Sequence, residues 1–172
     1  GGGTATDYLY PWPRDFRKGI FKYRSTPTDT LPRDEDLYRT IIKGVPGTSM
    51  PAWADALSPQ DTWALINLIK NFSPRFGKEP QGEKITINEP PQVTPQLIAK
   101  GKELFTKHKC DACHGQSLRG DGRLAESLLD AWKHAVFVQD ITVPGYYKGG
   151  FEAKDIFRTV STGLDGTPMS SY

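Results

Sequence analysis

The run Cys110-Asp111-Ala112-Cys113-His114 holds both cysteines of the chain and one of its three histidines. A C-x-x-C-H run is the attachment signature of c-type haem. Two thiols add to the two vinyl groups of the porphyrin, and the adjacent histidine ligates the iron from one face. The spacing therefore predicts that Cys110 and Cys113 anchor a haem and that His114 is an axial ligand of its iron.

Other uses of the two cysteines stay open. A disulfide between Cys110 and Cys113 would close a very small loop and stabilise little. A thioredoxin-like redox pair needs a β-α-β context, which the sequence does not show. A zinc site needs four ligands, and there is no second cysteine pair. A chance C-x-x-C run followed by histidine is the remaining alternative.

The two methionines of the chain lie at matched positions of an internal repeat. Residues 36–51 read DLYRTIIKGVPGTSMP, and residues 155–170 read DIFRTVSTGLDGTPMS, so that seven of sixteen positions are identical. The repeat pairs Met50 with Met169. A methionine is most often a packing residue, and this interpretation stays open for Met50. Met50 lies in a loop rich in Gly and Pro, however, where a packing role is less expected, and this position favours a ligand role.

The repeat divides the chain into a first copy (1–73), a Pro- and Gly-rich linker (74–93) and a second copy (94–172). The counterpart of His114 would fall just before Gly1, so we expect the C-x-x-C-H segment of the first copy upstream. Three residues follow Met169, so we expect a C-terminal helix of the second copy to be missing. The opening residues show no apolar segment, and we expect that a secretory leader was removed or lies upstream.

Several short helices are predicted to position these residues. Thr94 and Pro95 are a typical N-cap and first helical residue, and they predict a helix over 95–108 that leads to Cys110. Short helices over 36–43 and 154–161 should end at glycines and lead into the methionine loops. A further helix over 59–72 begins at a Ser cap. Its predicted buried stripe is Leu65, Ile66, Ile69 and Phe72.

The composition excludes other classes. The 172 residues include 17 Gly and 14 Pro and carry a formal net charge of +2. Such a chain is globular but loop-rich, and its charge argues against a strong nucleic-acid binder. No apolar run reaches the roughly 18 residues of a membrane-spanning helix.

Together these motifs resemble tandem class I cytochromes c, especially bacterial di-haem electron-transfer subunits. The residues that carry the resemblance are the helix before C-x-x-C-H, the Gly-Asp-Gly turn at 120–122, and the Gly-Thr-x-Met runs at 47–50 and 166–169. The resemblance implies an all-α fold of two domains, each with a few short helices and long loops wrapped around a haem. It also implies a periplasmic or otherwise extracytoplasmic location, and a redox protein or catalytic oxidoreductase subunit as partner.

The resemblance further implies roles for single residues. Cys110 and Cys113 are the thioether anchors, His114 and Met169 are the axial ligands, and Met50 is the axial ligand of a first haem. Three further residues are expected in the haem pockets: Arg39 and Arg158, which would pair with haem propionates, and Trp132. For these three, a solvated arginine or a plain core aromatic stays open.

His/Met ligation fills both axial positions of the iron and leaves none for a substrate. The expected function is therefore electron transfer, not enzymatic catalysis. Two alternatives stay open. One is a di-haem peroxidase-like enzyme with a releasable ligand, and the other is a docking domain whose first copy lacks haem.

Overall fold

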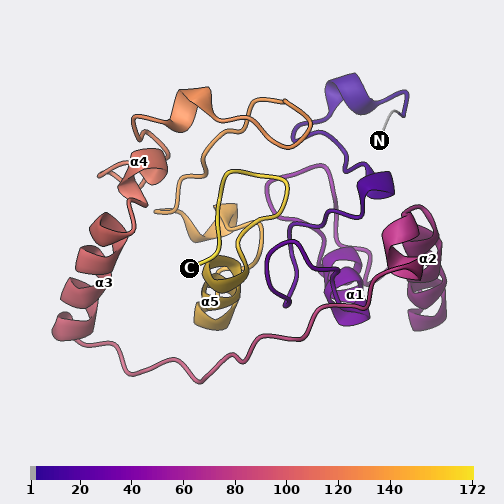
Figure 1. The fold of residues 1–172 in the computed structure, drawn as a ribbon, viewed down its shortest axis with the longest axis horizontal. Helices are drawn as coiled ribbons and strands as arrows, with labels where there is room; N and C mark the ends of the chain where they lie inside the picture. The colour runs from indigo at the N-terminus through magenta and orange to yellow at the C-terminus, as the bar shows by residue number, and fades with distance from the viewer. Residues whose placement is uncertain (1–2) are drawn as a thin grey trace.

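The computed structural model describes residues 3–172, and within these residues the chain is helical and has no strand. Five α-helices are joined by long loops and short 3-10 turns (Figure 1). They are α1 (Asp34–Lys43), α2 (Pro59–Asn71), α3 (Pro95–Lys107), α4 (Asp111–His114) and α5 (Ala153–Thr162). The all-α prediction is confirmed, and the four longer helices lie within two residues of their predicted bounds.

Local signals explain where the helices begin. The Ser58 hydroxyl accepts a hydrogen bond from the Asp61 amide at 3.1 Å at the start of α2. The Thr94 hydroxyl accepts one from the Leu97 amide at 3.1 Å at the start of α3. Each cap satisfies one of the backbone donors that a helix leaves free in its first turn. Both predicted caps are confirmed.

The apolar core lies in the first copy, where α1 packs against α2. Its buried members are Phe21, Leu37, Ile41 and Ile66. The predicted stripe of α2 is only half right. Ile66 is fully buried and Ile69 packs against the core, but Leu65 and Phe72 are 37% and 49% exposed. The reason is that α2 lies at the edge of the molecule and presents only one narrow face to α1 (Figure 1).

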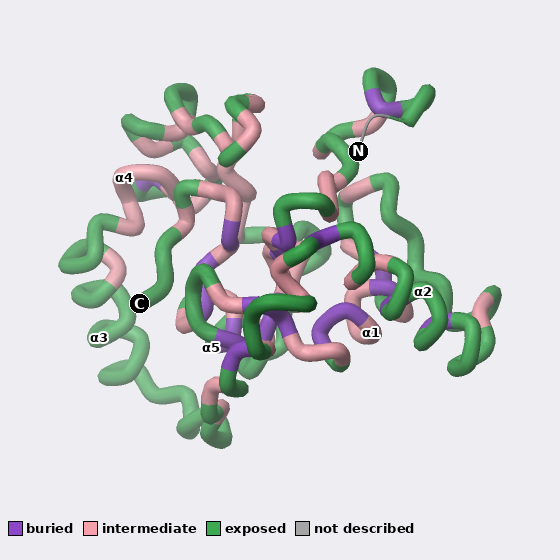
Figure 2. The backbone as a smooth tube through the Cα atoms, turned by 45° about the vertical axis from the view of Figure 1, so that its right-hand side comes forward, coloured by how far each residue is buried: buried purple, intermediate pink, exposed green. Residues whose placement is uncertain are grey.

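The second copy buries no aliphatic or aromatic side chain among its described residues. Figure 2 shows buried chain around α1 and the central loops, whereas α3 is exposed at every residue except the half-buried Phe105. Apolar side chains that should form a core stay uncovered here, including Leu104 at 39%, Phe157 at 46% and Phe137 at 70% exposure. The second copy is a shell of helices and loops without an apolar centre of its own.

Much of the segment assigned to the linker contacts the first copy. Arg75 donates hydrogen bonds to the carbonyls of Gly19 and Asp29. Further on, the Ile85 amide donates to the Ser25 carbonyl at 2.8 Å. From there an extended stretch leads to α3 at the far edge of the molecule (Figure 1). No helix among the described residues is long and apolar enough to cross a bilayer.

Candidate haem site and methionine loops

Helix α4 is a single turn that carries the attachment motif. The His114 amide donates to the Cys110 carbonyl at 2.9 Å. Cys110, Cys113 and His114 are thus related as i, i+3 and i+4, and such positions share one face of a helix. Lys109 adopts a left-handed conformation, with φ of 57°, and turns the chain between α3 and α4. Both cysteines are free thiols and are half-buried.

The Gly-Asp-Gly turn at 120–122 packs against α4 and donates hydrogen bonds to it. The Gly120 amide donates to the His114 carbonyl at 3.0 Å, and the Gly122 amide donates to the Cys113 carbonyl at 3.1 Å. A Cβ on Gly122 would lie 2.5 Å from the Ala112 carbonyl oxygen and 2.6 Å from that of Asp111. Residue 122 must therefore be glycine for the turn to lie this close to the helix.

The electrostatics favour a histidine ligand over a redox-active thiol pair. Burial lowers the pKa of His114 and so favours the neutral ring, with the Gln139 backbone acting in the opposite direction. Its Nδ1 atom is buried without a hydrogen-bond partner. Burial raises the pKa of Cys110. A catalytic thiol pair needs a lowered pKa, which argues against the thioredoxin-like alternative.

The two methionine loops share one conformation. In the first, the Val45 amide donates to the Met50 carbonyl at 2.9 Å, and in the second the Leu164 amide donates to the Met169 carbonyl at 3.0 Å. Both α1 and α5 end at a left-handed glycine, Gly44 with φ of 64° and Gly163 with φ of 65°.

The match extends to the side chains and to the residues beyond each methionine. The hydroxyls of Thr48 and Thr167 accept hydrogen bonds from the amides of Met50 and Met169 at 3.1 and 3.3 Å. The Trp53 amide donates to the Ile41 carbonyl, and the Tyr172 amide donates to the Val160 carbonyl. The two hydrogen bonds span the same number of residues. Identical hydrogen bonds in both copies show that the sequence repeat is also a structural one.

The loop of Met169 lies near the attachment motif. Tyr172 contacts the ring of His108 edge to face, with centroids 5.4 Å apart. His108 caps α3 and precedes Cys110 by two residues, and Tyr172 follows Met169 by three. The chain therefore brings the second methionine loop to the end of α3 that leads into α4 (Figure 1). Met169 is half-buried and Met50 is 36% exposed.

The two candidate arginines occupy matched positions and face each other across the interface between the copies. Arg39 pairs with Asp36 at 2.9 Å, and Arg158 pairs with Asp155 at 2.6 Å. Burial lowers the pKa of Arg39, and the positive charge of Arg158 lowers it further. The two guanidinium groups therefore stand close enough to repel each other.

A cavity of about 480 Å³ opens beside these arginines, between the copies. It is lined by both copies, with Tyr23, Arg39 and Lys43 from the first and Lys148, Gly149 and Phe151 from the second. Nearby, burial lowers the pKa of Lys22 to about 8, and the charges of Arg14 and Lys148 contribute to the shift. Nothing in the sequence marks Lys22 and Lys148, because only the fold brings them together.

Trp132 lies at the same interface. The guanidinium carbon of Arg14 lies 4.6 Å from its ring centre and the Lys18 ammonium nitrogen 4.9 Å. Its indole Nε1 is buried without a hydrogen-bond partner. A buried N–H that lacks an acceptor is costly. Trp132 thus offers a free donor within a cationic region.

Three observations fit a haem in this chain. The described part of the second copy lacks an apolar centre, and His114 Nδ1 and Trp132 Nε1 are buried without a hydrogen-bond partner. The interface also gathers cations that an anionic propionate would neutralise. Among the described residues, no group of three or more His, Cys, Asp or Glu side chains could hold a metal ion.

Comparison with known proteins gives one informative similarity. No family model matches the sequence, and no curated protein matches it. A solved chain from the Kuenenia stuttgartiensis reducing HAO-like protein complex Kustc0457/Kustc0458 is similar in structure, with a TM-score of 0.94 and 36% sequence identity. The similarity covers 98% of this chain and 76% of the Kuenenia chain.

Proposed function

The chain belongs to the protein family of this Kuenenia chain, and from that premise we propose that it carries haem c and transfers electrons. The observation that carries the proposal is helix α4, which places two free thiols and a half-buried histidine on one face of a single turn. The name of the Kuenenia complex describes that protein as part of a reducing assembly. We propose that this chain likewise works beside a catalytic oxidoreductase subunit, outside the cytoplasm.

When bound, haem c supplies an iron centre that takes up and releases one electron. The residues of the chain would hold and tune it. Cys110 and Cys113 would form the thioether bonds, and His114 and Met169 would ligate the iron from opposite sides. If His114 and Met169 both bind the iron, no position on it would be left for a substrate, and this would favour a carrier over a peroxidase-like enzyme.

The cationic interface would bind the haem propionates. Arg39, Arg158 and Trp132 were candidates from the sequence, and Lys22 and Lys148 join them by position. Positive charge beside the carboxylates would offset their negative charge in a partly buried place. The uncovered apolar side chains of the second copy would pack against the porphyrin and exclude water.

Met50 is proposed as the axial ligand of a first haem. Its loop makes the same hydrogen bonds as the loop of Met169, which is the support for a shared role. Both cysteines of residues 1–172 belong to the second copy. The anchors of a first haem would therefore have to come from outside these residues.

Haem content and axial ligation can be measured separately. A pyridine haemochrome assay on the purified protein should detect covalent haem that is lost in the Cys110→Ser/Cys113→Ser double variant. The oxidised protein should show the weak far-red absorption band of a methionine bound to Fe(III), and Met169→Ala should remove the contribution of the second haem. Absence of covalent haem in the wild type would refute the proposed function. Covalent haem without the far-red band would refute Met169 ligation alone.

A further inference from the structure

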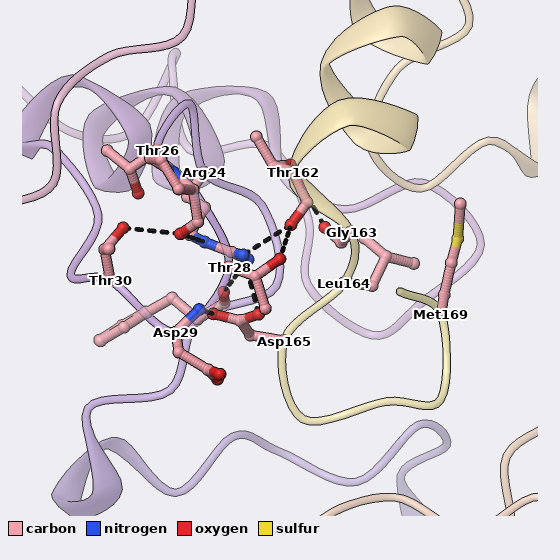
Figure 3. A network of polar contacts seen from close by, with 12 residues as sticks. Arg24, Thr26, Thr28, Asp29, Thr30, Thr162, Gly163, Leu164, Asp165 and Met169 are labelled. Carbon is pink, nitrogen blue, oxygen red and sulfur yellow. Dashed lines mark hydrogen bonds and ion pairs between the residues drawn. The ribbon is translucent and has the colours of Figure 1, made fainter. Parts of the chain in front are cut away.

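We propose that Arg24 of the first copy is a positioning residue for the methionine loop of the second copy, residues 163–169. The inference rests on the proposed function, because that loop carries the candidate ligand Met169. Arg24 is only 1% exposed. Its Nη2 atom lies 2.8 Å from the Asp165 carboxylate and donates to the Thr162 carbonyl at 2.6 Å (Figure 3).

Arg24 is itself held by its own copy. Its Nε donates to the Pro27 carbonyl at 3.1 Å, and its Nη1 donates to the Phe21 carbonyl at 3.4 Å. Nε and Nη1 of the guanidinium therefore bind the first copy, whereas Nη2 binds the second copy. A planar group with donors in a fixed fork is suited to such a bridge.

Two neighbours of Arg24 contact the same loop. The Thr28 hydroxyl donates to the Thr162 carbonyl at 3.0 Å. The Asp29 amide donates to the Asp165 carboxylate at 3.1 Å, from a backbone in the left-handed region with φ of 63°. The Thr162 carbonyl lies at the C-terminus of α5, where the helix dipole is negative and a cation is favoured. Figure 3 shows these contacts meeting where α5 ends and the loop begins.

The repeat shows that Asp165 is not needed to fold the loop. Its counterpart in the first copy is Pro46, and the two loops otherwise share their hydrogen bonds. Arg24 and Thr28 contact Thr162 through its main-chain carbonyl, which any residue supplies. The side chain that is particular to the second loop is therefore that of Asp165, and its carboxylate contacts Arg24 and Asp29 of the first copy.

The network acts on the start of the loop. Gly163, in the left-handed region with φ of 65°, follows directly after the Thr162 carbonyl that Arg24 and Thr28 hold. Fixing Thr162 and Asp165 fixes the direction in which the chain leaves α5 toward Met169. Loss of the network should let the loop open more often while the loop of Met50, which has no such support, is unchanged.

Backbone hydrogen exchange of the full chain gives a test that does not depend on methionine ligation. Arg24→Met and Asp165→Pro should each accelerate exchange of the Leu164 and Thr167 amides by at least about tenfold, since exchange there requires local opening. The matched Val45 and Thr48 amides should not change. Asp165→Pro copies the residue of the first loop and should fold even if Arg24→Met does not.

The haem-loaded protein gives the second readout. Exogenous imidazole binds a methionine-ligated haem only after the methionine leaves, so the binding rate reports loop opening. Both variants should raise that rate about tenfold for the haem at Cys110 and Cys113. Arg17→Met is the control. Arg17 also forms an ion pair, with Asp15, but its side chain is 80% exposed, so the same substitution should leave the rate unchanged.

The outcomes separate this proposal from the proposed function. Absent haem, or absent far-red absorption in the wild type, counts against the function, while the exchange experiment still decides the role of Arg24. Unchanged Leu164 and Thr167 amides in both variants would overturn the positioning role. Equal acceleration in both methionine loops would also overturn it, because that result would mean general destabilisation.

Discussion

Replacing Gly122 by alanine should loosen α4 from the turn that clamps it. The new Cβ would lie 2.5 Å from the Ala112 carbonyl oxygen, which is too close for any real contact. The turn must then move away, and two hydrogen bonds are lost or lengthened, from Gly122 to Cys113 and from Leu124 to Ala112. At about 1 kcal/mol each, the free energy of unfolding should fall by about 2 kcal/mol.

Thermal unfolding followed by circular dichroism measures this change. For a chain of this length, a loss of about 2 kcal/mol corresponds to a melting temperature lower by about 4–8 °C. Gly77→Ala is the matched control, because a Cβ on Gly77 would meet nothing within 4 Å. It should change stability by less than about 0.5 kcal/mol. If Gly122→Ala melts together with the control, the close approach of turn and helix is not a constraint and the clamp argument fails.

Two further predictions test the core and the cationic interface. Ile66→Ala should lower the free energy of unfolding by about 2–5 kcal/mol in urea titrations, because the side chain is fully buried at the contact of α1 and α2. Leu68 lies on the same helix but is 51% exposed, so Leu68→Ala should lower the free energy of unfolding far less. Equal losses in the two variants would contradict the assigned core. Lys22→Met should stabilise the haem-free chain at pH 7. In the folded wild type the pKa of Lys22 is about 8, below its ordinary value of 10.5. Between pH 8 and pH 10.5 the unfolded chain therefore binds more protons than the folded chain, and the stability of the wild type rises with pH in this range. The advantage of Lys22→Met should therefore shrink from pH 8 to pH 10.5, and a pH-independent difference would refute burial of the Lys22 charge.

The helices were predictable because their signals are local. Ser58 and Thr94 sit directly before the turns that they cap, and the cap needs no information from the rest of the fold. The attachment motif is local in the same way, since one helical turn places its cysteines and histidine on one face. The exposure of Leu65 and Phe72 was not predictable, because periodicity marks an apolar face without telling how wide a neighbour will cover it.

The interface could not be read from the sequence. Lys22 and Lys148 approach each other only after both copies have folded, and nothing in their sequence neighbourhoods marks them as a pair. The contact between Arg24 and Asp165 has one trace in the sequence, a difference between the two copies of the repeat. Within a repeat that keeps Arg, Thr, Gly and Met, the exchange of Pro46 for Asp165 places a charge at a loop position that the fold does not require. A difference between copies points to a contact that only one copy makes.

The unequal distribution of apolar contacts explains why these interface residues matter. The first copy buries Phe21, Leu37, Ile41 and Ile66 among themselves, whereas the described part of the second copy buries no large apolar side chain. Burial of apolar surface is the main driving force for folding. In the described part of the second copy, the hydrogen bonds around α4 and the network of Arg24 therefore carry more of the structure than they would beside an apolar core. A haem anchored at Cys110 and Cys113 would supply apolar surface where Leu104 and Phe157 are now uncovered, so that the same residues that attach the haem would also complete the fold.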